Sequence, residues 1–230
     1  MKKSKSYPKK NMKFAVIAVD VVGFAIKENQ LHILLIKNKN KPFEGLWALP
    51  GGLVQTKESL DEAVWRHLKN KTGLKEAYVE QLYSFGSIDR DPLGRVVSVA
   101  HLALVNNIKL KTELKTTDNY SAIGWFAVDK LPKTAYDHKE IIKCALERLR
   151  GKLSYTNIVY GLLPKKFTLG EMQAVYEIIL SKKLDKRNFR KKILGLKILC
   201  KTGELRTGGT NRPAVLYEFV SRKSKVVEVL

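Results

Sequence analysis

Cysteine is scarce in this chain of 230 residues, which contains only Cys144 and Cys200. The two lie far apart and match neither a metal-binding nor a disulfide spacing, which excludes a disulfide-rich scaffold and a zinc ribbon. Long apolar runs are also missing, so no segment reaches the length of a membrane span. The basic start precedes an apolar run that Asp20 interrupts, and it lacks a convincing signal cleavage site. We therefore expect a cytoplasmic protein with no membrane partner.

Acidic residues are few, since 22 Asp and Glu stand against 43 Lys and Arg, for a net charge of +21. The excess is densest in residues 151–230, where 17 basic and 6 acidic residues give +11. A lysine-rich proteome would explain the overall charge but not its concentration at this end. Such a density predicts a polyanionic partner, with nucleic acid as the first candidate.

The first two thirds of the chain have the pattern of a mixed sheet with helices. Aliphatic and β-branched residues fill 13–26 and 31–37, which flank the turn KENQ and are typical of a hairpin. Apolar positions at helical spacing predict a helix over 138–150. An α/β (α+β) fold follows from this order. Further strands are predicted in LWALPGGLV and at 78–87, 95–106 and 121–128.

Residues 51–74, GGLVQTKESLDEAVWRHLKNKTGL, contain the most specific motif of this part. Ser59 and Glu62 form a Ser-x-x-Glu capping box, which predicts that a helix starts at Ser59. The spacing of the whole stretch resembles the Nudix box, in which glutamates hold magnesium for phosphate hydrolysis. The residues that match the box are Gly52, Glu58, Arg66, Leu68, Gly73 and Leu74.

The three metal-binding glutamates of the Nudix box are replaced by His67, Asn70 and Lys71. Spacings of three and four residues put these side chains on one helix face. Magnesium prefers carboxylate oxygens, so Asn is a poor replacement and Lys repels the cation. We therefore expect no catalytic residues, no metal and no cofactor here. By the same resemblance, the retained Glu58 and Arg66 form an ion pair that braces the loop against the helix.

The resemblance to Nudix domains covers about residues 13–150 and implies an α/β/α sandwich that binds an effector. Residues 1–12 precede it as a basic arm, which we expect to be disordered. Residues 151–167 follow it, have no clear period and contain Pro164. This segment is interpreted as a linker that partly packs.

A second unit is predicted over 168–230. Thr168 and Glu171 form another capping box, and Asp185 is a suitable N-cap for a following helix with a basic start. The strand KILCK, a glycine-rich tip and the strand AVLYEFV come next. Helix, turn, basic helix and β-hairpin predict a winged helix-turn-helix. The apolar stripe of its first helix comprises Met172, Val175, Tyr176, Ile179 and Leu180.

The basic helix has the residue types that read double-stranded DNA, because Arg and Asn donate bidentate hydrogen bonds to guanine and adenine. Residues of the wing would contact phosphates or the minor groove. The alternatives are a solvated cationic face, a protein-docking module or, more weakly, an RNA partner. The predicted DNA-binding residues are Lys186, Arg187, Asn188, Arg190, Lys191, Arg206, Thr207 and Arg212.

The Nudix-like half, with the segments LLPKKFTLGEMQAVYEIIL, LDKRNFRKKIL and GTNRPAVLYEF, resembles the Nudix-related transcriptional regulators of the NrtR group over about residues 13–220. The resemblance implies repression of NAD or sugar metabolism genes in response to ADP-ribose, a related nucleotide or a sugar. It assigns DNA recognition to Arg187, Asn188, Arg190 and Arg212. Two recognition helices one DNA turn apart predict a homodimer on a palindromic operator.

Loops beside the box helix carry candidate effector-binding residues. Aromatic rings stack on a base, and arginines pair with a diphosphate. Core packing is the slightly favoured alternative for the two aromatic residues, and a surface position is the alternative for the arginines at 90 and 95. The predicted ligand-binding residues are Phe43, Trp47, Arg66, Arg90 and Arg95.

A Nudix hydrolase of ADP-ribose or of a nucleoside diphosphate sugar, with an accessory basic domain, is the rival interpretation. It requires magnesium and carboxylates from outside the box helix. Glu58 together with Glu44 or Glu80 is the set that the sequence offers.

Overall fold

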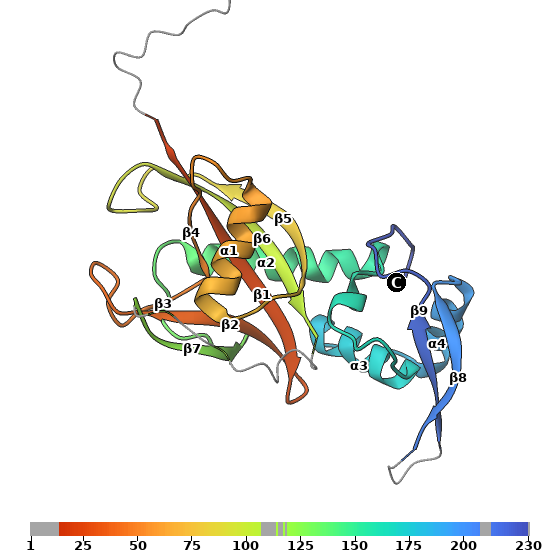
Figure 1. Ribbon diagram of the computed structural model, residues 1–230. Helices are drawn as coiled ribbons and strands as arrows, with labels where there is room; N and C mark the ends of the chain where they lie inside the picture. The colour runs from red at the N-terminus through yellow and green to blue at the C-terminus, as the bar shows by residue number, and fades with distance from the viewer. Residues whose placement is uncertain (1–13, 107–113, 115–116, 118, 208–212, 230) are drawn as a thin grey trace, which may run out of the picture.

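The computed structural model describes residues 14–106, 114, 117, 119–207 and 213–229 (Figure 1). The basic arm predicted at 1–12 lies outside these residues, as does the tip of the wing at 208–212, which includes Arg212. Within the described ranges, no helix has the length and hydropathy needed to cross a membrane.

The predicted hairpin is confirmed as β1 (Val16–Lys27) and β2 (Gln30–Asn38), which pair antiparallel. Its two-residue turn consists of Glu28 and Asn29, with φ angles of 51° and 58°. Two consecutive left-handed residues match the right-handed twist of the flanking strands, which is why such turns favour Asn.

The hairpin lies in a mixed sheet, in which β1 also pairs with β6 in parallel and the other neighbours are antiparallel. The described strands have the order β3-β2-β1-β6-β5, with β4 on β1 and β7 on β2. All the strands predicted after the hairpin are present. Their bounds are Trp47–Ala48 (β3), Gly51–Leu53 (β4), Tyr78–Phe85 (β5), Val96–Val105 (β6) and Tyr120–Ala127 (β7).

Two helices cover opposite faces of this sheet (Figure 1). Val19 and Val21 of β1 pack with Ala63, Val64 and Leu68 of α1 (Leu60–Thr72). The alternate residues of β1 face the other way, into the cluster that includes residues of α2 (His138–Tyr155). This alternation follows from the period of two in a strand. It produces the predicted α/β/α sandwich.

The segment 151–167 is more ordered than the linker that the sequence suggested. Helix α2 continues through Gly151 to Tyr155, five residues beyond its predicted end at 150, and buries Leu153 on its apolar stripe. A 3₁₀ helix, η2 (Ile158–Gly161), follows and is buried throughout. The segment therefore forms part of the hydrophobic core.

The C-terminal part is the predicted winged helix-turn-helix. It consists of α3 (Leu169–Leu180), α4 (Lys186–Gly195) and the antiparallel hairpin of β8 (Leu199–Arg206) and β9 (Ala214–Phe219). The Thr168 capping box and the Asp185 N-cap both form as expected. Apolar residues of α3, α4 and β9 belong to the same core cluster as those of β1 and α2. The core is thus continuous from the sheet into the winged helix.

Candidate functional site

The frame of the 51–74 motif is held by backbone caps at both ends of α1. Ser59 Oγ accepts from Glu62 N at 3.2 Å, while Glu62 Oε2 accepts from Ser59 N at 2.7 Å. At the other end, Gly73 has a φ of 77° and donates its N–H to the Lys69 carbonyl. Glycine is favoured there because a left-handed residue with a Cβ is strained. These contacts fix the orientation of the helix face that would carry the metal ligands.

Glu58 and Arg66 form the ion pair that the resemblance implied. Arg66 Nε donates to Glu58 Oε2 at 2.7 Å, Arg66 Nη2 donates to Oε1, and Nη2 also reaches the Leu53 carbonyl at 3.0 Å. The hydrogen bonds from Arg66 lower the pKa of Glu58 to about 2. The pair therefore joins the loop before α1 to the helix itself, as a bidentate Arg–carboxylate contact can.

The helix face that holds the metal in a Nudix box has no carboxylate at the three replaced positions. Their side chains, those of His67, Asn70 and Lys71, differ in exposure. His67 is buried under Gly52, where a Cβ would lie 2.7 Å from the imidazole Cε1. Its Nε2 is 3.2 Å from the Leu53 carbonyl, and burial lowers the pKa of the ring, which favours the neutral form. Asn70 is exposed. Lys71 donates its Nζ to the Gly51 carbonyl and to the Tyr120 hydroxyl.

Lys71 borders a cleft of about 360 Å³ between the sheet and the loop at 90–95 that precedes β6. Strands β1, β2, β4 and β7 contribute to its walls, together with Tyr136 and His138. Arg90 and Arg95, two of the predicted ligand-binding residues, also line this cleft. Phe43, Trp47 and Arg66 are not among the described residues that line it.

Asp20 forms the floor of the cleft and was not identified as a site residue in the sequence. It accepts hydrogen bonds from Ser98 Oγ at 2.6 Å and Arg90 Nη2 at 3.2 Å, and its Oδ1 is 3.4 Å from His138 Nε2. Burial raises its pKa, but His138, Ser98 and Arg90 outweigh burial and hold the pKa at about 2. An acidic residue inside an otherwise apolar strand was the available signal, because a buried charge requires partners.

Arg90 is buried and not on the surface. Its guanidinium donates to both carboxylate oxygens of Asp137, at 2.9 and 2.8 Å, and to Asp20. Arg95 is exposed, and its Nη1 donates to the carbonyls of Gly86 and Ser87 at 2.8 and 2.9 Å. The two arginines therefore shape the cleft wall through contacts within the protein.

The two predicted aromatic residues pack against other rings. Phe43 lies 4.0 Å from Tyr136, measured between ring centroids, and Tyr136 itself lines the cleft. Trp47 packs edge-on against Phe126 at 4.4 Å. The contact of Trp47 agrees with the core-packing alternative. Phe43 is separated from the cleft by the ring of Tyr136.

The basic start of α4 is presented to solvent. Asp185 Oδ1 caps the helix by accepting from Asn188 N at 2.7 Å, and Phe189 and Ile193 anchor its other face in the core. Burial of two residues four apart leaves the remaining faces outward. The five residues of this helix that were predicted to contact DNA are all exposed: Lys186, Arg187, Asn188, Arg190 and Lys191.

On the wing, Arg206 is tied to the first helix of the module. Its Nη1 donates to Glu171 Oε1 at 2.6 Å, and its Nη2 is 3.4 Å from the Lys166 carbonyl. Thr207 is exposed at the end of β8. The contact with Glu171 places Arg206 beside the N-terminus of α3.

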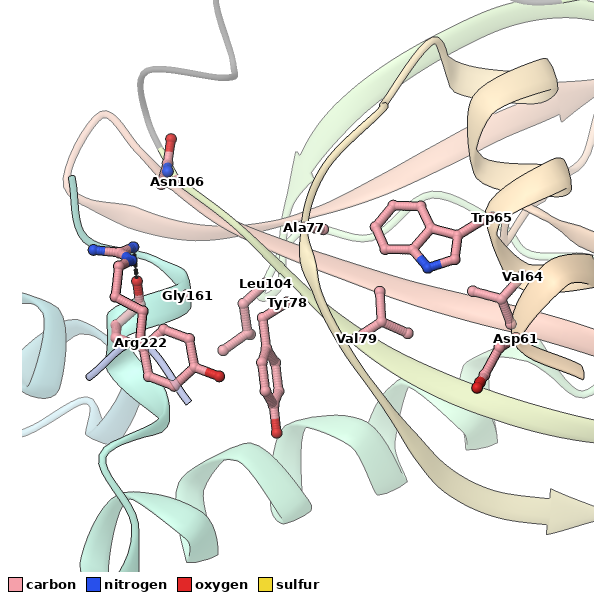
Figure 2. Close-up of a pocket in the computed structure, with 11 residues that line it drawn as sticks. Asp61, Val64, Trp65, Ala77, Tyr78, Val79, Leu104, Asn106, Gly161 and Arg222 are labelled. Carbon is pink, nitrogen blue, oxygen red and sulfur yellow. Dashed lines mark hydrogen bonds between the residues drawn. The ribbon is translucent and has the colours of Figure 1, made fainter. Parts of the chain in front are cut away.

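The junction between the two parts is closely packed around Gly161 (Figure 2). A Cβ on this residue would lie 2.8 Å from Leu104 Cβ and 3.0 Å from Tyr78 Cβ, so η2 rests directly on β5 and β6. Arg222 Nη2 donates to the Leu163 carbonyl at 3.0 Å and to that of Tyr160. A second cavity, of about 470 Å³, opens here between α1, β5 and η2.

The fold and the site define a Nudix domain joined to a DNA-binding winged helix. The NUDIX domain family matches residues 16–145, and the family described as the NrtR DNA-binding winged helix domain matches residues 159–219. The chain belongs to the NrtR family of Nudix-related transcriptional regulators.

Three relatives illustrate the similarity. The ADPR responsive transcriptional repressor NtrR of Acinetobacter baylyi is 35% identical over 217 residues, which cover 93% of this chain and 85% of the relative. The crystal structure of Shewanella oneidensis NrtR complexed with a 27mer DNA superposes with a TM-score of 0.79 at 35% identity, covering 88% of this chain and 93% of that one. An ADP-ribose pyrophosphatase of Methanocaldococcus jannaschii is 44% identical over 126 residues, 55% of this chain and 71% of the relative.

Proposed function

We propose that this protein is a transcriptional repressor that binds ADP-ribose or a related nucleotide in the cleft beside α1 and does not hydrolyse it. The similarity to the ADPR responsive repressor of Acinetobacter baylyi extends over both parts of the chain and supports this function. The similarity to a NrtR structure in complex with DNA supports an operator as the partner of α4. NAD metabolism is the accompanying class of regulated genes that we propose.

The observation that carries the proposal is the ammonium of Lys71 at the cleft, where a Nudix hydrolase has a carboxylate. A cation there opposes magnesium, which requires oxygen ligands. Across the described ranges, no group of three His, Cys, Asp or Glu residues is arranged to hold a metal. Glu80 is occupied by Tyr78 and Lys152, and Glu44 is exposed in a loop. We infer that effector binding needs neither magnesium nor another cofactor.

The proposed mechanism couples effector binding to DNA affinity through the junction. The ion pair of Lys152 with Glu80 and the contacts of Gly161 join β5 and β6 to the helices that carry α3 and α4. Any shift of the sheet on ligand binding is therefore transmitted by close-packed groups and not by a flexible tether. In a homodimer, a small change in the spacing of two α4 helices alters the fit to two half-sites.

The experiment measures binding of a labelled operator fragment, taken from upstream of the gene, by fluorescence anisotropy at fixed salt. Saturating ADP-ribose is expected to change the operator affinity by 5- to 150-fold, the usual range of allosteric coupling. Unchanged affinity with ADP-ribose, and a change with a pentose sugar instead, would contradict the proposed effector. Light scattering of the free protein and of the complex tests the homodimer. An excess of double-stranded RNA serves as the competitor that distinguishes the two nucleic acids.

Hydrolysis of ADP-ribose is the second candidate, because the Methanocaldococcus jannaschii relative, which is named for that activity, shares 44% identity with the Nudix half. The reaction would consume water and release AMP and ribose 5-phosphate. We expect no turnover with magnesium or with manganese, measured by release of AMP. Robust turnover that disappears in Glu58→Gln would show that the protein is an enzyme.

A further inference from the structure

The cleft beside α1 is rich in oxygen atoms from three different strands. Gly51 of β4 presents its carbonyl and Tyr120 of β7 its hydroxyl to the same ammonium, that of Lys71. Asp20 of β1 is the register partner of Gly51, and a Cβ on Gly51 would lie 2.5 Å from Asp20 Oδ1. Carbonyl, hydroxyl and carboxylate oxygens together form a place for a cation. Here the cation is part of the polypeptide.

The other charges of the cleft are already paired within the protein. Among the described lining residues, Arg90 and Arg95 are the further cations, and Asp20 and Asp91 are the acids. Arg90 is neutralised by Asp20 and Asp137, and Arg95 hydrogen-bonds two carbonyls of its own loop. Lys71 and Arg95 are therefore the cations of this lining that make no ion pair with a carboxylate among the described residues, and of the two Arg95 is the exposed one. A diphosphate entering the cleft would otherwise meet the negative charge of Asp20.

We propose that the ammonium of Lys71 replaces the divalent cation of a Nudix site and binds the diphosphate of the effector directly, so that binding is independent of metal. An ammonium has three N–H donors. Gly51 and Tyr120 engage two of them, which leaves the third for a phosphate oxygen. The inference rests on the proposed function, because it names how the same cleft recognises its ligand. It also explains how a box without its glutamates retains an anionic ligand.

Isothermal titration of the full-length protein with ADP-ribose tests the inference. The wild type is expected to bind with the same Kd, within twofold, in EDTA and in millimolar magnesium. Lys71→Met is expected to weaken binding by roughly 10- to 100-fold, the range for a lost hydrogen bond to a charged group. Lys69→Met is the matched control, because Lys69 is exposed on the same helix two residues earlier. Its affinity should equal that of the wild type.

Lys71→Gln serves as a second variant if Lys71→Met does not fold, and circular dichroism and thermal unfolding are recorded for each. The free variants are expected to be as stable as the wild type while their affinity falls. If the wild type no longer binds ADP-ribose in EDTA, the role of Lys71 is overturned. The same holds if both variants fold and bind ADP-ribose as tightly as the wild type. Either result leaves the proposed function intact. Absence of ADP-ribose binding by the wild type under every condition would instead reject the proposed function, and this inference with it.

Discussion

Arg90 and Asp137 are joined by two hydrogen bonds of 2.9 and 2.8 Å, with Arg90 buried and also bonded to Asp20. Removing the guanidinium would leave the largely buried carboxylate of Asp137 without its counter-ion, and it would leave Asp20 with Ser98 and His138 as its partners. We expect Arg90→Met to lower the free energy of unfolding by about 3–5 kcal/mol, the usual consequence of breaking a buried ion pair on one side. Urea unfolding followed by fluorescence measures the loss.

Arg95→Met is the matched control for that experiment. Arg95 is exposed, and its hydrogen bonds within the described ranges go to two backbone carbonyls, so we expect a change of about 0.5 kcal/mol or less. If Arg90→Met unfolds like the wild type but no longer binds ADP-ribose, Arg90 is a ligand-binding residue and not a brace of the cleft floor.

The contacts of Arg90 also show how much of the structure can be predicted from the sequence. Local signals sufficed for the elements: two capping boxes, the turn at Glu28 and Asn29, and apolar residues at periods of two and 3.6 residues all formed as expected. The ion pair between Arg90 and Asp20 joins residues 70 positions apart. No local pattern specifies such a contact, because it depends on the parallel pairing of β1 with β6 and on the loop before β6.

The end of α2 shows a different limit of prediction from the sequence. The helix was predicted to end at residue 150, just before Gly151, which has a low helix propensity, but the buried stripe of Ala145, Leu149 and Leu153 continues past it. Burial against the sheet outweighs the weak local preference of one glycine. Likewise, the residue type of Lys71 led the sequence to predict a site that opposes metal binding, whereas the contacts of Lys71 with Gly51 and Tyr120 required the fold.

The affinity for ADP-ribose should depend on pH if Lys71 binds the diphosphate. Burial lowers the pKa of Lys71 to about 8, with Asp20 raising it and Arg66 lowering it further. Burial raises the pKa of the neighbouring Tyr120, which therefore remains a neutral phenol through this range. A bound diphosphate favours the ammonium and so raises the pKa of Lys71 in the complex.

The direction of this pH dependence follows from the linkage between proton binding and ligand binding. Below about pH 7 the ammonium is present in free and bound protein alike, so the affinity is constant. Above pH 8 binding requires uptake of a proton, and the affinity is expected to fall by up to about tenfold per pH unit. Titration calorimetry from pH 6.5 to 9.5 measures this slope, which should be absent in Lys71→Met. A flat profile in the wild type, or the same slope in the variant, would contradict it.

Two tyrosines of the core should respond in opposite directions to the loss of their hydroxyl. The hydroxyl of Tyr176 is buried without a hydrogen-bond partner among the described residues, and burial raises its pKa. Tyr176→Phe is expected to leave the protein as stable or more stable, by about 1 kcal/mol, because an unsatisfied buried hydroxyl is removed. Tyr78 instead donates to Glu80 Oε2 at 2.6 Å, and Tyr78→Phe should lower stability by about 1 kcal/mol. Denaturant unfolding measures the stability of both variants relative to the wild type. Destabilisation by Tyr176→Phe would contradict the prediction and would reveal a hydrogen-bond partner for that hydroxyl.

The exposed start of α4 should separate readout of base sequence from attraction to phosphate. Arg187 and Arg190 are positioned by the buried Phe189 and by the Asp185 cap, so their guanidinium groups are presented on a rigid helix. Alanine at either position is expected to reduce the discrimination between operator and random DNA by about 1–3 kcal/mol.

Lys191 is exposed next to Arg190 on the same helix and serves as the comparison, since lysine acts on phosphates as a point charge. Lys191→Ala should weaken operator and random DNA alike and reduce the slope of log affinity against log salt by about one. Anisotropy titrations on both DNAs, from low to physiological salt, give discrimination and slope from the same data. Equal weakening on both DNAs by Arg187→Ala and Arg190→Ala would assign the arginines to the phosphate backbone, and sequence would then have to be read by other residues of the module.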